Sequence, residues 1–404
     1  MSWRCCRLDW LATEERSAIN PTEISADTVF HYSIPALDEV GDGRLEPPDE
    51  IGSGKLLLSG GEVLISKLNP RLPRVLLAEA HDVPTLASTE FIALRPGPNI
   101  DERFLRYWLG SEPLRQMLNG ATMSVTRSQQ RVRPEVLTKS WLRVPPIDEQ
   151  RAVADYLDRE TARIDALIEK KRRMIELLEE RFWCSFVARI VAADARLIPL
   201  RRALLAITDG PFGSSLTSTH YSRDGARVVR LGNIGFAEFK DEDQAFIPIS
   251  YYHTLLKHRV RAGDLLIAGL GDSRHHVGRA CVAPDLGPAI VKADCYCGNI
   301  DHSRAECRFL ALLLSSPIGA AAAAVAARGT TRSRINLEIA KEIAVPLPSL
   351  NEQRGVVAQV DADRRHTGAL TQRLRHQVDL LQEHRQALIT AAVAGELEIP
   401  GVAA

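Results

Sequence analysis

Two short motifs resemble sites that bind phosphate or transfer methyl groups, but each lacks a residue that the chemistry requires. Gly52-Ser53-Gly54-Lys55-Leu56 is similar to a phosphate-binding loop. It has Asp49 where the first glycine is needed, and Leu56 has no hydroxyl group to bind magnesium as serine or threonine does. Asp209-Gly210-Pro211-Phe212 resembles the Asp/Asn-Pro-Pro-aromatic motif of amino-methyltransferases, but Gly210 replaces the first proline. No glycine-rich methyl-donor loop opens a strand–helix unit elsewhere, which argues against methyl transfer by this chain.

Metal chemistry is not indicated either. Nuclease carboxylates spaced as Pro-Asp and then Asp/Glu-x-Lys do not follow Pro48-Asp49 or Pro284-Asp285. The seven cysteines are irregularly spaced, and Cys295-x-Cys297 lacks the paired C-x2-C spacing of a zinc site, so we expect reduced thiols. His275-His276 has no nucleophile paired with it in the sequence. We therefore predict no catalytic residue, no metal and no cofactor.

Two windows without acidic residues contain arginine among serine, threonine and glutamine. They extend from Pro113 to Pro134 and from Cys307 to Leu337. Guanidinium groups beside hydroxyl and amide donors suit the phosphate oxygens and base edges of DNA. The whole chain has 51 basic and 51 acidic residues, so DNA binding must come from such local patches or from partners.

The candidate DNA-binding residues come from these windows and from one loop in each half. In the first half they are Lys67, Asn69, Arg71, Arg127, Ser128, Gln130, Arg131 and Arg133. In the second half they are Arg274, His275, Arg279, Arg328, Thr331, Arg332 and Arg334. For any single arginine the alternative is a solvated loop without a DNA contact. Matched windows in both halves argue against that alternative.

The elements that must position these windows occur twice. Pro145-Pro146-Ile147-Asp148-Glu149-Gln150-Arg151 returns as Pro348-Ser349-Leu350-Asn351-Glu352-Gln353-Arg354, and the offset of 203 then holds for about thirty residues. Each copy predicts a long helix that starts after the proline, with Asp148 or Asn351 as its cap. Heptad spacing from Val360 to Leu388 indicates a coiled-coil seam, and the two copies are the obvious partners for each other.

The repeat extends into the segments before each helix and indicates an α/β (α+β) fold with a pseudo-two-fold internal repeat. Short apolar runs between glycine and proline turns predict strands, and Gly263-Asp264-Leu265-Leu266-Ile267 parallels Gly61-Glu62-Val63-Leu64-Ile65. We predict globular domains at 1–143 and 197–345. The two long helices are predicted within 144–196 and 346–404.

We predict a cytoplasmic protein that does not span a membrane. The N-terminal residues Met-Ser-Trp-Arg are charged where a signal peptide needs an apolar core. The uncharged stretch from Phe309 to Ala327 is interrupted by Pro317 and Gly319. The matching stretch of the first half is flanked by arginines, so we expect a buried helix, a turn and a small-residue helix.

Taken together and in this order, the motifs resemble the specificity (S) subunit of type I restriction-modification systems over essentially the full length. The resemblance is carried by Pro146–Arg151, Ser349–Arg354, Asp209–Ser215 and Gly329–Arg332. The first half departs from it, because Ser124-Val125-Thr126-Arg127 stands where Gly-Thr-Thr-Arg is typical.

The resemblance implies two target-recognition domains separated by two long antiparallel helices. It implies a non-catalytic chain that binds a bipartite, asymmetric target in double-stranded DNA and positions two modification (methyltransferase) subunits and, for cleavage, restriction (translocase-nuclease) subunits. The alternatives are a stand-alone DNA methyltransferase or nuclease, and a structural coiled-coil adaptor. Our candidates for partner docking on the helices are Glu149, Gln150, Arg151, Arg172, Arg173, Glu352, Gln353, Arg354 and Arg375.

Overall fold

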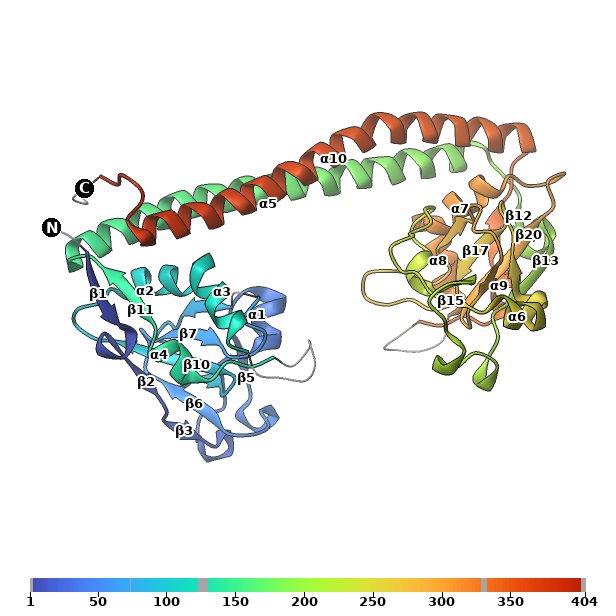
Figure 1. The fold of residues 1–404 in the computed structure, drawn as a ribbon. Helices are drawn as coiled ribbons and strands as arrows, with labels where there is room; N and C mark the ends of the chain where they lie inside the picture. Colours follow the sequence, from blue (N-terminus) through green and yellow to red (C-terminus); the bar gives the residue numbers. More distant parts are fainter. Residues whose placement is uncertain (1–2, 73, 123–129, 328–332, 401–404) are drawn as a thin grey trace. The chain divides into compact units, whose positions relative to one another are not determined.

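The computed structural model describes residues 3–72, 74–122, 130–327 and 333–400. The chain divides into two compact units, which are described separately (Figure 1). Unit 1 consists of Met1–Arg172 and Leu374–Ala404, and unit 2 consists of Arg173–Arg373. The four segments expected from the sequence are a finer division than these units and stay a prediction.

Unit 1 is a mixed α/β structure that contains parts of both long helices. Its own helices are α1 (Ile34–Val40), α2 (Glu102–Leu109), α3 (Glu112–Gly120) and α4 (Pro134–Thr138), with the first part of α5 (Ile147–Ala192) and the last part of α10 (Leu350–Ala394). Its strands are β1 (Arg4–Arg7), β2 (Ala12–Glu15), β3 (Ala18–Ile19), β4 (Val29–Tyr32), β5 (Arg44–Glu46), β6 (Lys55–Leu58), β7 (Val63–Ser66), β8 (Val75–Leu77), β9 (Thr85–Ser88), β10 (Phe91–Pro96) and β11 (Trp141–Val144).

Unit 2 has the same kinds of element. Besides the other parts of α5 and α10, its helices are α6 (Ile249–Tyr252), α7 (Cys307–Ser315), α8 (Pro317–Ala326) and α9 (Leu337–Glu342). Its strands are β12 (Leu197–Pro199), β13 (Leu204–Asp209), β14 (Ala226–Val229), β15 (Phe246–Ile247), β16 (Arg259–Val260), β17 (Leu265–Ala268), β18 (Ala280–Val282), β19 (Ala289–Val291), β20 (Cys295–Ile300) and β21 (Ala344–Pro346).

The sheets of the two units correspond, except that the third sheet of unit 1 has one additional strand, β3. The pair β1-β11 in unit 1 matches β12-β21 in unit 2, and the antiparallel sheet β2-β10-β7-β8 matches β13-β20-β17-β18. The third sheet is β3-β6-β9-β4-β5 in unit 1 and β15-β14-β19-β16 in unit 2, each with one parallel pair, β4 with β9 and β14 with β19. The internal repeat predicted from the sequence is therefore a repeat of topology.

Each core places sheet, short helix and long helices in contact. In unit 1, Leu94 of β10, Phe104 of α2 and Leu157 of α5 are fully buried in one cluster, together with Ile389 of α10. In unit 2, α7 is buried almost throughout, against residues of β17, α5 and α10. Burial of a large aliphatic or aromatic side chain contributes roughly 1.5–3 kcal/mol, so these contacts hold the long helices firmly to each unit.

The long helices start and stop at residues with clear local causes. Proline precedes each start, and Ser349 caps α10: its hydroxyl accepts from the N–H of Glu352, whose carboxylate accepts from the N–H of Ser349. The expectation that Asp148 and Asn351 cap the two helices was wrong, because α5 already begins at Ile147 and α10 at Leu350. At the other end Gly395 has a φ of 75°, which favours glycine, and a Cβ atom there would lie 3.2 Å from Trp3.

The two helices are antiparallel within each unit, as predicted. In unit 1, Asp165 pairs with Arg385 at 2.9 Å, and Lys171 donates to Gln377 at 2.8 Å. Ile164, Ile168 and Val378 are buried between them. In unit 2, Arg189 pairs with Asp363 at 3.0 Å, and Arg364 lies over the ring of Phe182 at 4.8 Å. Within unit 1, the residue numbers of the contacting partners on α10 decrease as those on α5 increase, as they must in an antiparallel pair.

Among the described residues, no individual helix is both long and apolar enough to cross a membrane. In the same described part of the chain, only the pair of α7 and α8 would be long and apolar enough, and the two helices are bent by 70° where they meet. The buried helix, turn and small-residue helix expected from the sequence are found here, since α7 packs in the core of unit 2.

Candidate nucleic-acid interface

In unit 1, two of the predicted DNA-binding segments are joined by backbone hydrogen bonds. The loop after β7 contains Lys67 and Asn69, and the segment before α4 contains Gln130 and Arg131. The N–H of Asn69 donates to the carbonyl of Gln130 at 2.8 Å, and the N–H of Val132 donates to the carbonyl of Lys67 at 3.0 Å. Residues separated by about sixty positions therefore form one surface.

Unit 2 contains the same junction at the repeat-related positions. The N–H of Gly271 donates to the carbonyl of Ser333 at 2.9 Å, and the N–H of Ile335 donates to the carbonyl of Gly269 at 3.0 Å. Gly269 allows the close approach, because a Cβ atom there would lie 2.7 Å from the hydroxyl of Tyr296 and 2.9 Å from the carbonyl of Asp294.

An acidic residue fastens the two segments in each junction. In unit 1 the carbonyl of Glu90 accepts from the N–H of Lys67 at 2.8 Å, and its carboxylate accepts from Arg131 Nε at 3.0 Å and Nη2 at 2.9 Å. In unit 2 the carbonyl of Asp294 accepts from the N–H of Gly269 at 2.7 Å, and its Oδ1 accepts from Arg334 Nε at 3.0 Å and Nη2 at 2.7 Å. We call these two arrangements the loop junctions.

Both arginines remain accessible despite their partners. The side chain of Arg131 is 56% exposed and that of Arg334 is 55% exposed. The hydrogen bonds to Glu90 raise the pKa of Arg131 above its ordinary value, so the guanidinium stays charged. Each unit thus presents a permanently charged, planar donor at the same place in its fold.

The remaining described candidates surround these junctions in the sequence. Arg71 and Arg133 are exposed, and Arg133 directly precedes α4. In unit 2, Arg274 is exposed in a turn where Asp272 accepts from its N–H, a hydrogen bond that lowers the pKa of Asp272. His275 also bonds to Asp272 and stacks on Phe236, with ring centroids 5.8 Å apart. Arg127, Ser128, Arg328, Thr331 and Arg332 lie outside the described residues.

Arg279 does not form part of an accessible surface, which corrects its assignment as a DNA contact. Its side chain is buried and donates to the carbonyls of Leu231, Ile234, Leu270 and His276. Burial lowers the pKa of its guanidinium from the ordinary value. The residue holds the two loops around 231–234 and 270–276 together from inside the unit.

Gln150 and Gln353, predicted to dock partners, are also buried and have internal partners. Gln150 accepts from the N–H of Asp101 at 2.8 Å and donates to the carbonyls of Asn99 and Pro145. Gln353 accepts from the N–H of Glu306 at 2.9 Å and donates to the carbonyls of Arg304 and Pro348. The identical glutamines of the repeat therefore join each long helix to a short helix of its unit, α2 or α7.

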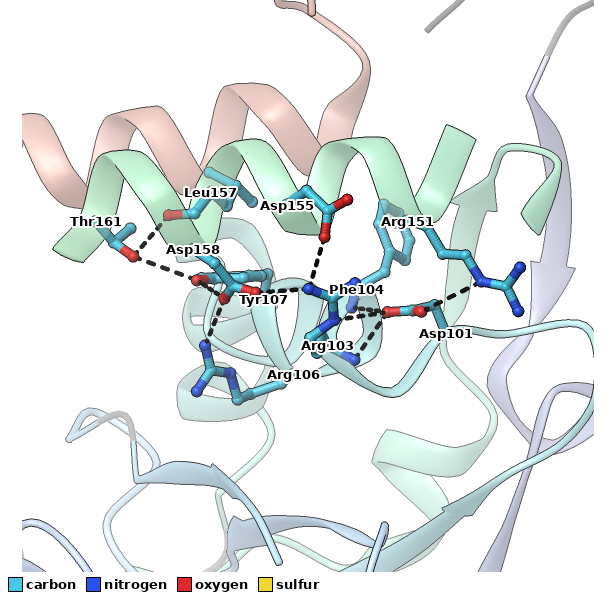
Figure 2. Close-up of polar contacts among 10 residues, drawn as sticks. All are labelled: Asp101, Arg103, Phe104, Arg106, Tyr107, Arg151, Asp155, Leu157, Asp158 and Thr161. Atoms are coloured by element: carbon cyan, nitrogen blue, oxygen red, sulfur yellow. Dashed lines mark hydrogen bonds and ion pairs between the residues drawn. The ribbon is translucent and has the colours of Figure 1, made fainter. Parts of the chain in front are cut away.

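Ion pairs extend this attachment along the helix. In unit 1, Arg103 of α2 donates to Asp155 at 2.7 Å and to Asp158 at 2.9 Å, while the hydroxyl of Tyr107 donates to Asp158 at 2.6 Å (Figure 2). Figure 2 also shows Thr161 next to Tyr107, with 3.2 Å between their hydroxyl oxygens. In unit 2, Arg308 of α7 pairs with Asp361 at 3.3 Å, so the arrangement recurs.

The other docking candidates include residues in local ion pairs and residues whose side chains are exposed. Arg151 pairs with Asp148 at 3.5 Å and lies 4.0 Å from Asp101 (Figure 2). Arg173 pairs with Glu176 and Glu180 along α5. Arg172, Arg354 and Arg375 are exposed, Glu352 caps its own helix, and Glu149 is half-buried.

Sequence reasoning did not identify Glu90 and Asp294, since it searched for basic and hydroxyl side chains. The two acids are 204 positions apart, close to the repeat offset, and each directly precedes a core strand, β10 or β20. Matching acids across the repeat would have found them. In the described part of the chain no group of three or more His, Cys, Asp or Glu residues has a geometry that could hold a metal ion.

Comparisons with known proteins were consistent with one family. No family model matches the chain. The specificity subunit of the type I restriction enzyme EcoBI from Escherichia coli is 22% identical over 315 residues, which cover 69% of this chain and 63% of that protein. The match therefore spans less than two thirds of the relative's length.

The chain was also compared with solved structures. A chain from a structure on the complex assembly and conformational transition of the type I restriction-modification system aligns over 98% of both chains, with a TM-score of 0.66 and 18% identity. The HsdS subunit from Thermoanaerobacter tengcongensis aligns over 98% of this chain and 97% of that one, with a TM-score of 0.42 and 20% identity. The relative from Escherichia coli confirms the resemblance that the repeated motifs indicate, and the structure with the TM-score of 0.66 has a similar fold. The chain is thus similar to the specificity subunits of type I restriction-modification systems.

Proposed function

We propose that this chain is the DNA-recognition subunit of a type I restriction-modification complex and has no catalytic site of its own. Each unit binds one part of a bipartite, asymmetric target in double-stranded DNA. The long helices carry two modification (methyltransferase) subunits and, for cleavage, restriction subunits. These partners imply a cytoplasmic complex.

The observation that supports this proposal best is the recurrence of the loop junctions. Each junction places an exposed arginine at the same point of a repeated fold, next to loops that differ between the units. A shared fold with different loops is what two domains that recognise different short DNA sequences require. The shared fold supplies the position, and the loop side chains supply the discrimination.

The near-neutral charge of the chain agrees with binding inside a larger assembly. With 51 basic and 51 acidic residues, the chain has no net charge with which to attract DNA. Neutralisation of phosphates dominates affinity in protein–DNA complexes, so much of that contribution must come from partner subunits. We therefore expect weak DNA binding by the isolated chain and tight, sequence-specific binding by the complex.

The test is to express the chain with its modification subunit and to sequence the methylated positions in a random DNA library. The expected result is one motif of two short parts separated by unspecified base pairs. Methyl transfer by the chain alone would favour the methyltransferase alternative. A complex that methylates without sequence preference would favour the structural adaptor.

A further inference from the structure

The acid of each loop junction is bonded to both of the segments that the junction joins. Glu90 and Asp294 each accept one backbone hydrogen bond from the first loop and two guanidinium hydrogen bonds from the second segment. No other described residue is bonded in this way to both segments of a junction. Asp294 has a φ of 64°, in the left-handed region that aspartate tolerates better than most residues. Its backbone therefore has a conformation that is uncommon for residues other than glycine.

The pairing leaves the outer edge of each guanidinium available. Both carboxylates take the side edge, formed by Nε and Nη2. An arginine has five N–H donors, and the fork of Nη1 and Nη2 is the edge that binds guanine O6 and N7 or a phosphate in bidentate fashion. Within the described ranges, the Nη1 groups of Arg131 and Arg334 have no hydrogen-bond acceptor in the protein.

The acid has two possible effects on such an arginine, and they differ in sign. As a competitor it would occupy the guanidinium and weaken all DNA binding. As a support it would restrict the rotamers of the long arginine side chain and fix the direction in which the free Nη1 and Nη2 edge points. Each acid contacts only the side edge and leaves the fork open, and each guanidinium is more than half exposed, so the geometry favours support.

The negative charge of the acid also affects whether the Nη1 and Nη2 edge binds a phosphate or the edge of guanine. A carboxylate about 3 Å from the guanidinium repels a phosphate that approaches the same group. The edge of guanine is uncharged and offers two acceptors at the spacing of the fork, so it meets no such repulsion. A supported arginine is therefore better suited to a base than to the backbone.

We propose that Glu90 and Asp294 are positioning residues that aim Arg131 and Arg334 at guanine, so that each unit identifies a G·C pair through its loop junction. This inference rests on the proposed function and adds the base and the residues that select it. A bidentate contact of arginine with guanine discriminates against other bases by roughly 5- to 150-fold. Most of that discrimination should depend on the acid.

The experiment uses the complex with modification subunits and compares Glu90→Gln and Asp294→Asn with the natural chain. These changes keep side-chain size and leave the backbone carbonyl in place. Competition binding against the methylated motif and all its single-base variants gives the discrimination at each position. Asp82→Asn and Glu242→Gln are matched controls, since both acids are exposed and lie outside the junctions.

Glu90→Gln should reduce discrimination at one G·C pair of one half-site at least fivefold, and Asp294→Asn should do so in the other half-site. The salt dependence of binding should stay the same, because no phosphate contact is lost. Arg131→Lys keeps the charge but removes the fork, so it should lose the same discrimination, and the double variant with Glu90→Gln should lose little more.

Two results would overturn the inference. If Glu90→Gln tightens binding to every duplex by a similar factor, the acid is a competitor and the arginine meets phosphate. If discrimination is unchanged in both acid variants, the acids do not position a base contact. Neither result affects the proposed function, which fails only if the natural complex itself has no bipartite motif.

Discussion

The side-chain oxygen of Gln150 accepts a hydrogen bond of 2.8 Å from the N–H of Asp101, which joins the first turn of α5 to the start of α2. Gln353 and Glu306 have the same relationship at the start of α10 and α7. In both cases the amide also donates to two backbone carbonyls, so both of its N–H donors and its oxygen are engaged inside the unit. The two long helices are therefore attached to their units by a polar bond of defined geometry as well as by apolar packing.

Gln353→Ala should destabilise unit 2, because it leaves the N–H of Glu306 and two carbonyls without their partner. Each buried polar group left unsatisfied costs about 1–3 kcal/mol, so we expect a loss of at least about 2 kcal/mol. Chemical denaturation measures it. Gln359→Ala on the exposed face of the same helix should change stability by less than about 0.5 kcal/mol. Equal effects of the two changes would contradict the attachment.

Val378→Asp should separate α10 from α5 within unit 1. Val378 is buried against Ile164 and Ile168, and a charge without a partner in such surroundings costs several kcal/mol. The matched control is Gln382→Asp, which places the same charge at an exposed position one turn further on. Thermal melting followed by circular dichroism should show a lower transition for the first variant alone.

Arg133→Gln should weaken binding of the complex to all DNA sequences alike. Arg133 is exposed beside the loop junction and has no acidic partner among the described residues, as suits a phosphate contact. Loss of one such contact makes the slope of the logarithm of the binding constant against the logarithm of the salt concentration less negative by about 0.9. The control is Arg163→Gln, an exposed change on α5 away from the loops. A change in preference at a single base pair would instead show that Arg133 contacts a base.

Charge reversal at Arg172 and Arg354 should release modification subunits without unfolding the chain. Both residues are exposed on the long helices, where surface substitutions usually stay within about 0.5 kcal/mol of neutral. Co-purification measures retention of the subunits, and melting measured in parallel monitors the fold. If the variants retain their subunits fully, partner docking lies elsewhere.

The four buried cysteines should resist alkylation until the protein unfolds. Burial raises the pKa of Cys281, Cys295 and Cys307 to about 12, and it also raises that of Cys297. A raised pKa keeps a thiol protonated and therefore unreactive at pH 8. Mass spectrometry after brief treatment with iodoacetamide should find labels on the exposed Cys5 and Cys184 first. Early labelling of Cys295 would show that unit 2 opens readily.

The long helices and the repeat could be predicted because the sequence pattern alone reveals them. A gapless offset of 203 and heptad spacing are visible without any knowledge of distant contacts. The acids of the loop junctions were not predicted, because Glu90 meets Arg131 across 41 positions and two different loops. Arg279 was misassigned for the same reason: its four carbonyl acceptors come from separate segments, and composition alone does not reveal that they surround it.

The division of unit 1 between two distant parts of the chain affects the order in which the protein can fold during synthesis. The core around Phe104 and Leu157 also requires Ile389 and Val393 of α10. A ribosome makes these last residues only after all of residues 173–373 have been produced. Unit 2 is continuous, so it can complete its core first, while unit 1 must wait with part of its apolar surface uncovered. The half that is translated first is thus the half that matures last.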